Sequence, residues 1–139
     1  MTEQRIRVLV CKLNFDAHDR GGRYISRKLM EAGMETIFSR VGTAKEAVEV
    51  ALQEDVDAIG FSILTGAHLL VAAELIDELK KAGMGNVPVI MGGLIPTDDI
   101  AQLKALGVAG VFTSVASPEE AVAGVRDAVL ARRAVEIGG

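Results

Sequence analysis

A strand–helix–strand pattern occupies residues 58–93, which read AIGFSILTGAHLLVAAELIDELKKAGMGNVPVIMGG. The two ends of this segment, residues 58–61 and 87–91, are apolar almost throughout, which is typical of strands covered on both faces. The stretch between them, residues 69–81, carries apolar side chains at helical spacing. Such a unit joins parallel strands by a right-handed crossover. It therefore predicts a parallel sheet with helices on both faces.

The same alternation continues on both sides of this unit. Further strand-like runs lie at residues 6–11, 36–38 and 108–113, and further helical runs at 21–32, 43–53, 98–105 and 118–132. Helix ends are marked by Gly33, Gly83 and Gly107, by the capping box of Thr43 and Glu46, and by Ser117 before Pro118. Five strands alternating with five helices predict an α/β, flavodoxin-like (Rossmann-like) domain with strand order 2-1-3-4-5. We expect a single domain over residues 1–139, with an ordered core at about 5–132 and a loose tail at 134–139.

Composition limits the classes of protein to be considered. The chain has 139 residues, of which 50% are hydrophobic and 24% charged, so a disordered chain is excluded. The net charge of -4, the absence of Trp and the lack of a Lys/Arg cluster argue against nucleic-acid binding. The apolar runs fall short of the roughly 20 residues that span a membrane, and the polar start predicts no signal peptide. We therefore expect a cytoplasmic protein that binds neither a membrane nor nucleic acid.

The only cysteine, Cys11, excludes an internal disulfide and any Cys-rich metal site. Because it lies within an apolar run, we interpret it as a small buried residue.

In such sheets a ligand binds at the carboxyl ends of the strands, near the point where the strand order reverses. The loop after the first strand, residues 12–22, contains neither the GxxxxGK[ST] pattern of a P-loop nor the GxGxxG pattern of dinucleotide-binding domains. A phosphorelay receiver would place an acidic pair at the end of strand 1 and a lysine at the end of strand 5, where this chain has Thr113. These nucleotide and phosphoryl sites are therefore disfavoured.

The first loop instead offers one imidazole with a carboxylate two residues before it. In an extended segment Asp16 and His18 lie on the same side, so Asp16 can accept a hydrogen bond from Nδ1 of His18 and leave Nε2 free to bind a metal. One histidine cannot form a protein-made metal site, which needs three or four ligands. A lone ligand suits a metal already held in a macrocycle, either haem or a corrin. The second histidine, His68, is expected to be solvated or to cap the third helix.

Glycines at the ends of two predicted strands favour a corrin over a haem. Gly66 follows the third strand and Gly92-Gly93 end the fourth, and the missing side chains open a slot between the sheet edge and the first helix. Ser62 and Leu64 are expected to line this slot. A cobalamin has a nucleotide tail that would fill it, whereas a haem has none.

These motifs together resemble a known family. Asp16-x-His18-x-x-Gly21, Ser62-x-Leu64 and Gly92-Gly93, in this order on five strand–helix units, resemble the cobalamin (B12)-binding domain family over about residues 5–132. Lys12, Asp19-Arg20 and the Ile95-Pro96 pair make the chain most similar to the cobalamin domain of acyl-CoA mutases of the methylmalonyl-CoA type, and less similar to the glutamate mutase small subunit. Ala17 departs from the glycine that acyl-CoA mutases often carry, and Asn14-Phe15 depart from the usual small or polar pair.

The resemblance implies a role for each matching residue. His18 would coordinate cobalt from the lower face while the dimethylbenzimidazole base is displaced into the slot, the base-off/His-on form. Asp16 would bond His18, and Lys12 would hold Asp16. Ser62 and Leu64 would contact the buried base, Gly92 and Gly93 would make room for the tail, and Gly21 would permit close approach. The other cofactor-binding residues implied are Asp19, Arg20 and Gly66, and no catalytic residue is expected beyond the cobalt ligand.

The resemblance also implies an activity and partners. The chain would be the small subunit of a two-chain isomerase, a methylmalonyl-, isobutyryl- or 2-hydroxyisobutyryl-CoA mutase that uses adenosylcobalamin to rearrange acyl-CoA by a radical mechanism. A barrel of ~250 residues does not fit in this chain, so a large TIM-barrel subunit would bind acyl-CoA, and a G-protein chaperone is a further implied partner. Alone, the chain is expected to be inactive. The alternatives are a corrinoid carrier for methyl transfer, a cobalamin-binding sensory module, and a flavodoxin-like domain without a corrin.

Overall fold

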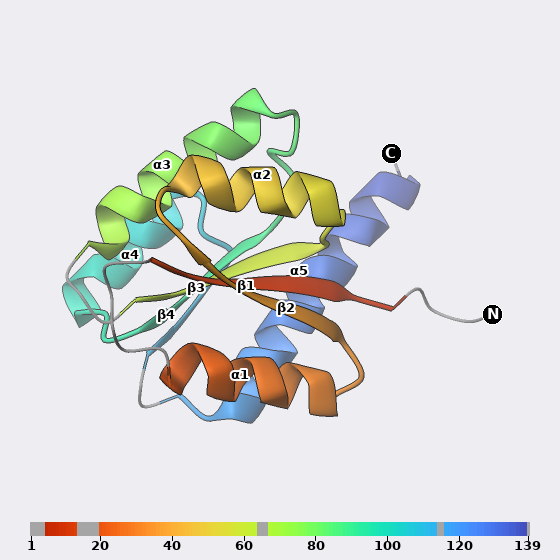
Figure 1. Ribbon diagram of the computed structural model, residues 1–139, viewed down its shortest axis with the longest axis horizontal. Helices are drawn as coiled ribbons and strands as arrows, with labels where there is room; N and C mark the ends of the chain where they lie inside the picture. The colour runs from red at the N-terminus through yellow and green to blue at the C-terminus, as the bar shows by residue number, and fades with distance from the viewer. Residues whose placement is uncertain (1–4, 14–19, 64–66, 114–115, 139) are drawn as a thin grey trace.

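A five-stranded parallel sheet lies at the centre of the computed structural model, which describes residues 5–13, 20–63, 67–113 and 116–138 (Figure 1). The strands are β1 (Arg7–Leu13), β2 (Glu35–Val41), β3 (Ala58–Ile63), β4 (Val89–Gly93) and β5 (Gly110–Thr113). Their order is β2-β1-β3-β4-β5, which confirms the expected flavodoxin-like α/β fold. Because all neighbouring pairs are parallel, the carboxyl ends of the strands share one edge, on the left in Figure 1.

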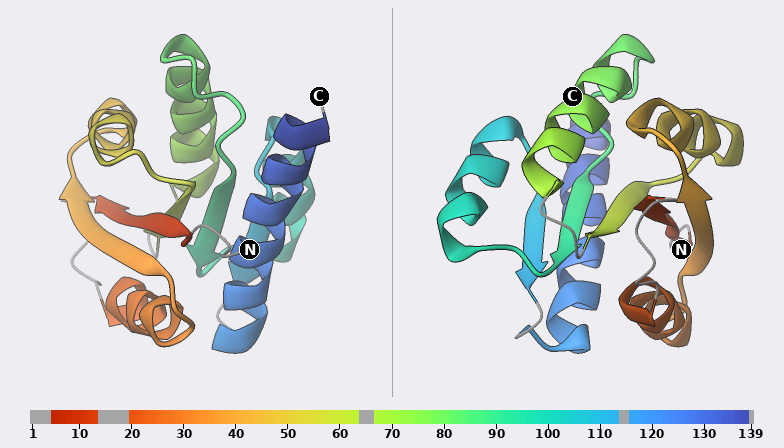
Figure 2. Two further views of the ribbon diagram at one scale, coloured as in Figure 1. Left: turned by 90° about the vertical axis from the view of Figure 1, so that its right-hand side faces the viewer. Right: turned by 60° about the vertical axis from the view of Figure 1, so that its left-hand side comes forward.

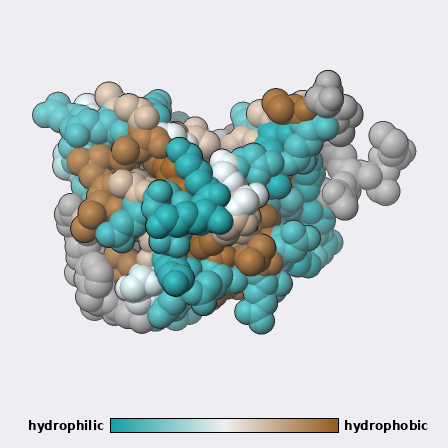
Figure 3. All heavy atoms as spheres, turned by 90° about the horizontal axis from the view of Figure 1, so that it is seen from above, coloured by the Kyte–Doolittle hydropathy of each residue, from teal (hydrophilic) through white to brown (hydrophobic). Residues whose placement is uncertain are grey.

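Helices cover both faces of the sheet (Figure 2). One face carries α1 (Arg20–Glu31) and α5 (Pro118–Gly138), and the other carries α2 (Ala44–Glu54), α3 (His68–Lys81) and α4 (Thr97–Leu106). Seen from the side of α2 and α3, the surface mixes hydrophilic and hydrophobic side chains (Figure 3). None of the helices in the described part of the chain is long and apolar enough to cross a membrane.

The last helix is longer than expected. It continues to Gly138, so the expectation of a loose tail from residue 134 is wrong for the segment up to that residue. Glu136 accounts for part of this extension, because its Oε1 accepts hydrogen bonds from Nε of Arg132 at 2.9 Å and from Nδ2 of Asn86 at 2.8 Å.

Strand β1 contributes to a hydrophobic core on each side of the sheet. Val8 and Val10 pack with α1 and α5, whereas Leu9 and Cys11 pack with α2, α3 and α4. All four side chains are almost completely buried. Both faces of the strand are therefore covered, as the near-continuous apolar pattern of such strands requires.

Cys11 is buried, as its apolar surroundings predict, and burial raises the pKa of its thiol to about 12. The thiol therefore stays protonated at about pH 8, where an unperturbed cysteine is partly ionised. We expect a disulfide reagent such as DTNB to leave Cys11 unmodified in the folded protein and to react with it fully in denaturant. Rapid reaction under native conditions would contradict this assignment.

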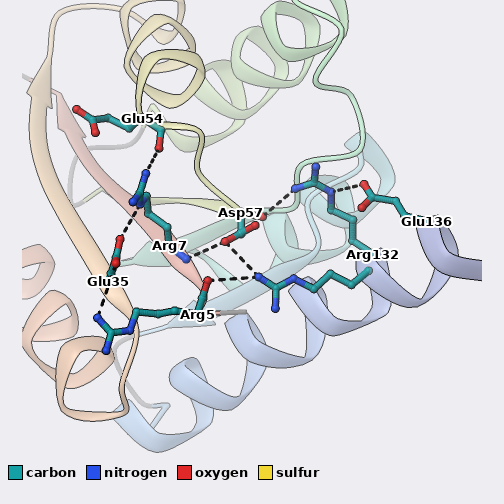
Figure 4. A network of polar contacts seen from close by, with 8 residues as sticks. Arg5, Arg7, Glu35, Glu54, Asp57, Arg132 and Glu136 are labelled. Carbon is teal, nitrogen blue, oxygen red and sulfur yellow. Dashed lines mark hydrogen bonds and ion pairs between the residues drawn. The ribbon is translucent and has the colours of Figure 1, made fainter. Parts of the chain in front are cut away.

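Hydrogen bonds and ion pairs join the strands at the amino edge of the sheet (Figure 4). Arg7 donates from Nε to Glu35 Oε2 at 2.7 Å and from Nη1 to the backbone carbonyl of Glu54 at 2.6 Å. Asp57 Oδ2 accepts from the backbone N–H of Arg7 at 2.8 Å and pairs with Nη2 of Arg133 at 3.4 Å. These contacts tie β1, β2 and α5 together at the edge opposite the carboxyl ends.

The Arg7–Glu35 pair predicts a pH dependence of stability. The hydrogen bond and the charge of Arg7 lower the pKa of Glu35 from its ordinary value of 4.5. A carboxyl whose pKa is lower in the folded state stabilises the fold above its unfolded pKa and loses that effect as the pH falls through the folded pKa. We expect Glu35→Gln to lower the melting temperature slightly at about pH 7, since the pair is solvent-exposed, and not at about pH 2. Equal differences at both pH values in thermal unfolding would contradict the pairing.

Candidate functional site

An apolar cavity of about 330 Å³ lies between the sheet and the helices α1 and α5. It reaches the carboxyl edge of the sheet, because residues at the ends of β3, β4 and β5 line it: Ser62, Gly92, Gly93 and Thr113. Its inner part is lined by aliphatic side chains of the core, among them Val10, Leu29 and Val125. The cavity lies where the slot between the sheet edge and the first helix was expected.

Two glycines shape the cavity wall at the end of β4. Gly93 has φ +120°, and a β-carbon on it would lie 2.0 Å from the backbone oxygen of Ile63. A β-carbon on Gly92 would lie 3.4 Å from the backbone oxygen of Phe112. The register pairs Gly93 with Ile63, so the missing side chain of Gly93 lets the ends of β3 and β4 approach each other closely. Gly92 pairs with Ser62, and a β-carbon there would make only an ordinary contact with β5.

Lys12 lies near the end of β1 and is completely buried. Its Nζ is 3.4 Å from the backbone oxygen of Ser62, at the end of the neighbouring strand β3. A buried ammonium group needs hydrogen-bond acceptors or an opposite charge close by. Lys12 therefore places its ammonium group beside the end of β3, at the carboxyl edge of the sheet.

The structure thus brings four of the candidate residues, Lys12, Ser62, Gly92 and Gly93, to one edge of the sheet. Arg20 and Gly21 form the start of α1. The other candidates lie outside the described residues: Asp16, His18, Asp19, Leu64 and Gly66. Within the described ranges, no group of three or more His, Cys, Asp or Glu side chains could hold a metal ion.

The sequence did not reveal the second helical wall of the cavity. Ala121 and Val125 of α5 line it opposite the α1 residues Tyr24 and Ile25. The apolar spacing of the last helix predicted a buried face, but not that this face borders the slot. The sequence feature that comes closest to indicating this wall is a group of small residues where the chain enters α5, which leave space there: Ala116, Ser117 and Ala121.

His68 is neither solvated nor a helix cap, so that expectation is wrong. The residue opens α3, and its side chain is buried against α4, with Nε2 at 2.7 Å from Asp99 Oδ2. Burial without this partner would leave the imidazole without compensation for lost water. The first turn of α4 supplies the acceptor, and 31 residues separate the two partners in the sequence.

Comparison with known proteins adds to this geometry. A family model described as the B12 binding domain matches residues 6–123. The chain is 39% identical to the 2-hydroxyisobutanoyl-CoA mutase small subunit of Aquincola tertiaricarbonis, over 96% of this chain and 99% of that one. It is 42% identical to the pivalyl-CoA mutase small subunit of Xanthobacter autotrophicus, over 84% of this chain and 79% of that one.

A solved structure has a similar fold. A cobalamin-binding protein from Desulfitobacterium hafniense superposes with a TM-score of 0.75 and 20% sequence identity, covering 90% of this chain and 60% of that one. At this identity the likeness concerns the fold alone.

Proposed function

This chain belongs to the B12-binding domain family, and from that membership we propose that it is the small, cobalamin-binding subunit of a two-chain acyl-CoA mutase. The cavity at the carboxyl edge is the observation that carries the proposal, because it offers a place for the nucleotide tail of the cofactor. The mutase assignment is supported by two relatives that are named mutase small subunits and match most of this chain. Corrinoid methyl carriers and sensory modules are not favoured by these relatives.

The residues around the cavity fit a cobalamin tail. A flat aromatic base is stabilised by burial against aliphatic and aromatic walls such as Val10, Ile25 and Phe112. Ser62, Thr113 and Ser117 add hydroxyl groups that can hydrogen-bond to a ring nitrogen or to the sugar and phosphate. The glycines at the end of β4 keep this wall free of side chains.

We propose His18 as the ligand of the cobalt, with Asp16 accepting the hydrogen bond of its other ring nitrogen. Lys12 would follow His18 and Asp16 in this chain of contacts, because its buried ammonium group can hold the carboxylate of Asp16 in place. When bound, adenosylcobalamin supplies the reactive carbon radical through homolysis of its cobalt–carbon bond. The residues of this chain would bind the tail in the cavity and orient the imidazole of His18.

The remaining candidates complete the proposed site. Asp19, Arg20 and Gly21 would lie under the corrin ring at the start of α1, and Leu64 and Gly66 would lie beside the buried base. The partner is proposed to be a large subunit whose TIM barrel binds a branched acyl-CoA, and a G-protein chaperone is proposed to serve the complex. The proposed location is the cytoplasm.

Reconstitution tests this proposal. The chain is titrated with adenosylcobalamin while the absorbance spectrum is followed, and it is then mixed with its large subunit and an acyl-CoA. We expect a base-off spectrum on binding, no activity of the chain alone, and carbon-skeleton rearrangement by the mixture. Methyl transfer to a thiol or a pterin would support the carrier alternative, and the absence of cobalamin binding would overturn the proposal.

A further inference from the structure

His68 and Asp99 join two helices at the edge of the sheet where the cavity opens. His68 is the first residue of α3, and Asp99 lies in the first turn of α4. Their side chains are only 3% and 22% exposed, and Nε2 lies 2.7 Å from Oδ2. At this depth water competes little with the hydrogen bond between the two side chains.

The pair lies beyond the last paired residues of β3 and β4. The ladder between these strands ends at Ile63 and Gly93, where the positive φ of Gly93 turns the chain away. From there one segment leads to α3 and the other to α4. The N-cap residues of these helices, Ala67 and Pro96, make no side-chain capping hydrogen bond. The contact between His68 and Asp99 therefore fixes two helix starts that their own caps do not fix.

The chemistry of the two groups determines which of them donates the hydrogen bond. A carboxylate only accepts, so Nε2 of His68 donates to Asp99. The negative charge of Asp99 is favoured in the first turn of α4, where free backbone N–H groups point outward. The other ring nitrogen of His68, Nδ1, is buried without a partner among the described residues. The bond to Asp99 is thus the hydrogen bond that holds this ring in the described structure.

We propose that His68 and Asp99 are a positioning pair for the cofactor site. Their hydrogen bond holds the start of α3, the helix that follows β3, and the start of α4, the helix that follows β4, at a fixed separation. The ends of β3 and β4, which form part of the cavity wall, are thereby in place before the ligand arrives. A preformed wall raises affinity because less order must be created on binding. This inference rests on the proposed binding of cobalamin, although neither side chain lines the cavity itself.

Two replacements of the histidine separate the hydrogen bond from simple packing. In His68→Gln the amide nitrogen reaches the position of Nε2, so it can still donate to Asp99. In His68→Asn the amide nitrogen takes the position of Nδ1, so it cannot. Asp99→Ala removes the acceptor, and Asp98→Ala is its matched control, because Asp98 lies in the same helical turn but is exposed.

The measurements are the dissociation constant of adenosylcobalamin, from absorbance titration, and the melting temperature of each variant without cofactor. We expect His68→Asn and Asp99→Ala to weaken binding about tenfold, the scale of one hydrogen bond to a charged group. His68→Gln and Asp98→Ala should bind within about twofold of the unmodified chain. The spectrum of the bound cofactor should be unchanged in all four.

Unchanged affinity in His68→Asn and Asp99→Ala, with or without a lower melting temperature, would overturn the positioning role. Equal losses in His68→Gln and His68→Asn would also overturn it, since packing would then explain the effect. If His68→Asn fails to fold, the comparison of Asp99→Ala with Asp98→Ala decides the question. Failure of the unmodified chain to bind cobalamin would instead overturn the proposed function, and the inference with it.

Discussion

Alanine in place of Gly93 is expected to destabilise the domain and to weaken cobalamin binding by about 100-fold or more. The new β-carbon would lie 2.0 Å from the carbonyl oxygen of Ile63 and 2.8 Å from its carbonyl carbon. Both atoms belong to the backbone of β3, so the clash is relieved only by moving one strand end away from the other. The φ of +120° adds strain of about 1–3 kcal/mol for a residue with a side chain. The cavity wall is therefore expected to change shape.

Gly83→Ala is the matched control for this prediction. Gly83 also has a positive φ, +76°, but a β-carbon there would meet no atom within 4 Å. This variant therefore measures the backbone strain without the clash, and it should lower the melting temperature less and leave cobalamin affinity unchanged. Thermal unfolding and absorbance titration of both variants test the difference. Equal behaviour of the two variants would contradict the close approach of β3 and β4.

Filling the cavity is expected to weaken cobalamin binding without destabilising the domain. Ala121 of α5 lines the cavity, and Ala121→Leu would place three further carbon atoms within it or at its wall. An unfilled apolar cavity leaves its lining without contacts, so the added side chain can stabilise the cofactor-free domain by up to about 2 kcal/mol. The same atoms would occupy the space proposed for the cofactor base. We expect an equal or higher melting temperature together with about 100-fold weaker cobalamin binding.

Ala123→Leu provides the comparison for this change, because Ala123 lies on the same helix but is exposed and does not line the cavity. It should leave the affinity for cobalamin unchanged. If Ala121→Leu bound cobalamin as tightly as Ala123→Leu did, the cavity would not be the place of the tail.

The alternation of apolar runs was sufficient to predict the fold, but the extent of some elements depends on contacts outside them. Strand β2 was expected only at residues 36–38, whereas it spans Glu35–Val41. Its end contains Ser39 and Arg40, polar residues that an edge strand accommodates because it pairs with β1 on one side only. Similarly, α5 is extended by Glu136, which binds Asn86 in a distant segment.

The candidate site could be predicted only in part, because some of its contacts also depend on residues in other elements. Ser62 and Gly92-Gly93 could be placed at the carboxyl edge because parallel strands bring their ends together. The contribution of α5 to the cavity depends on how this helix packs beside α1, which no local pattern encodes. The burial of His68 depends on Asp99, a partner in another helix, and a single histidine near a helix start gives no sign of such a partner.

The central claim is that His18 supplies the nitrogen bound to cobalt while the cofactor base lies in the cavity. Electron paramagnetic resonance of the Co(II) cobalamin complex tests it most directly, with the protein labelled with ¹⁵N and the cofactor unlabelled. We expect the nitrogen splitting of each cobalt line to change from a triplet to a doublet on labelling, and the histidine signal to be lost in His18→Ala. A triplet that persists in the labelled protein would mean that the cofactor's own base remains on the cobalt, and would contradict the account.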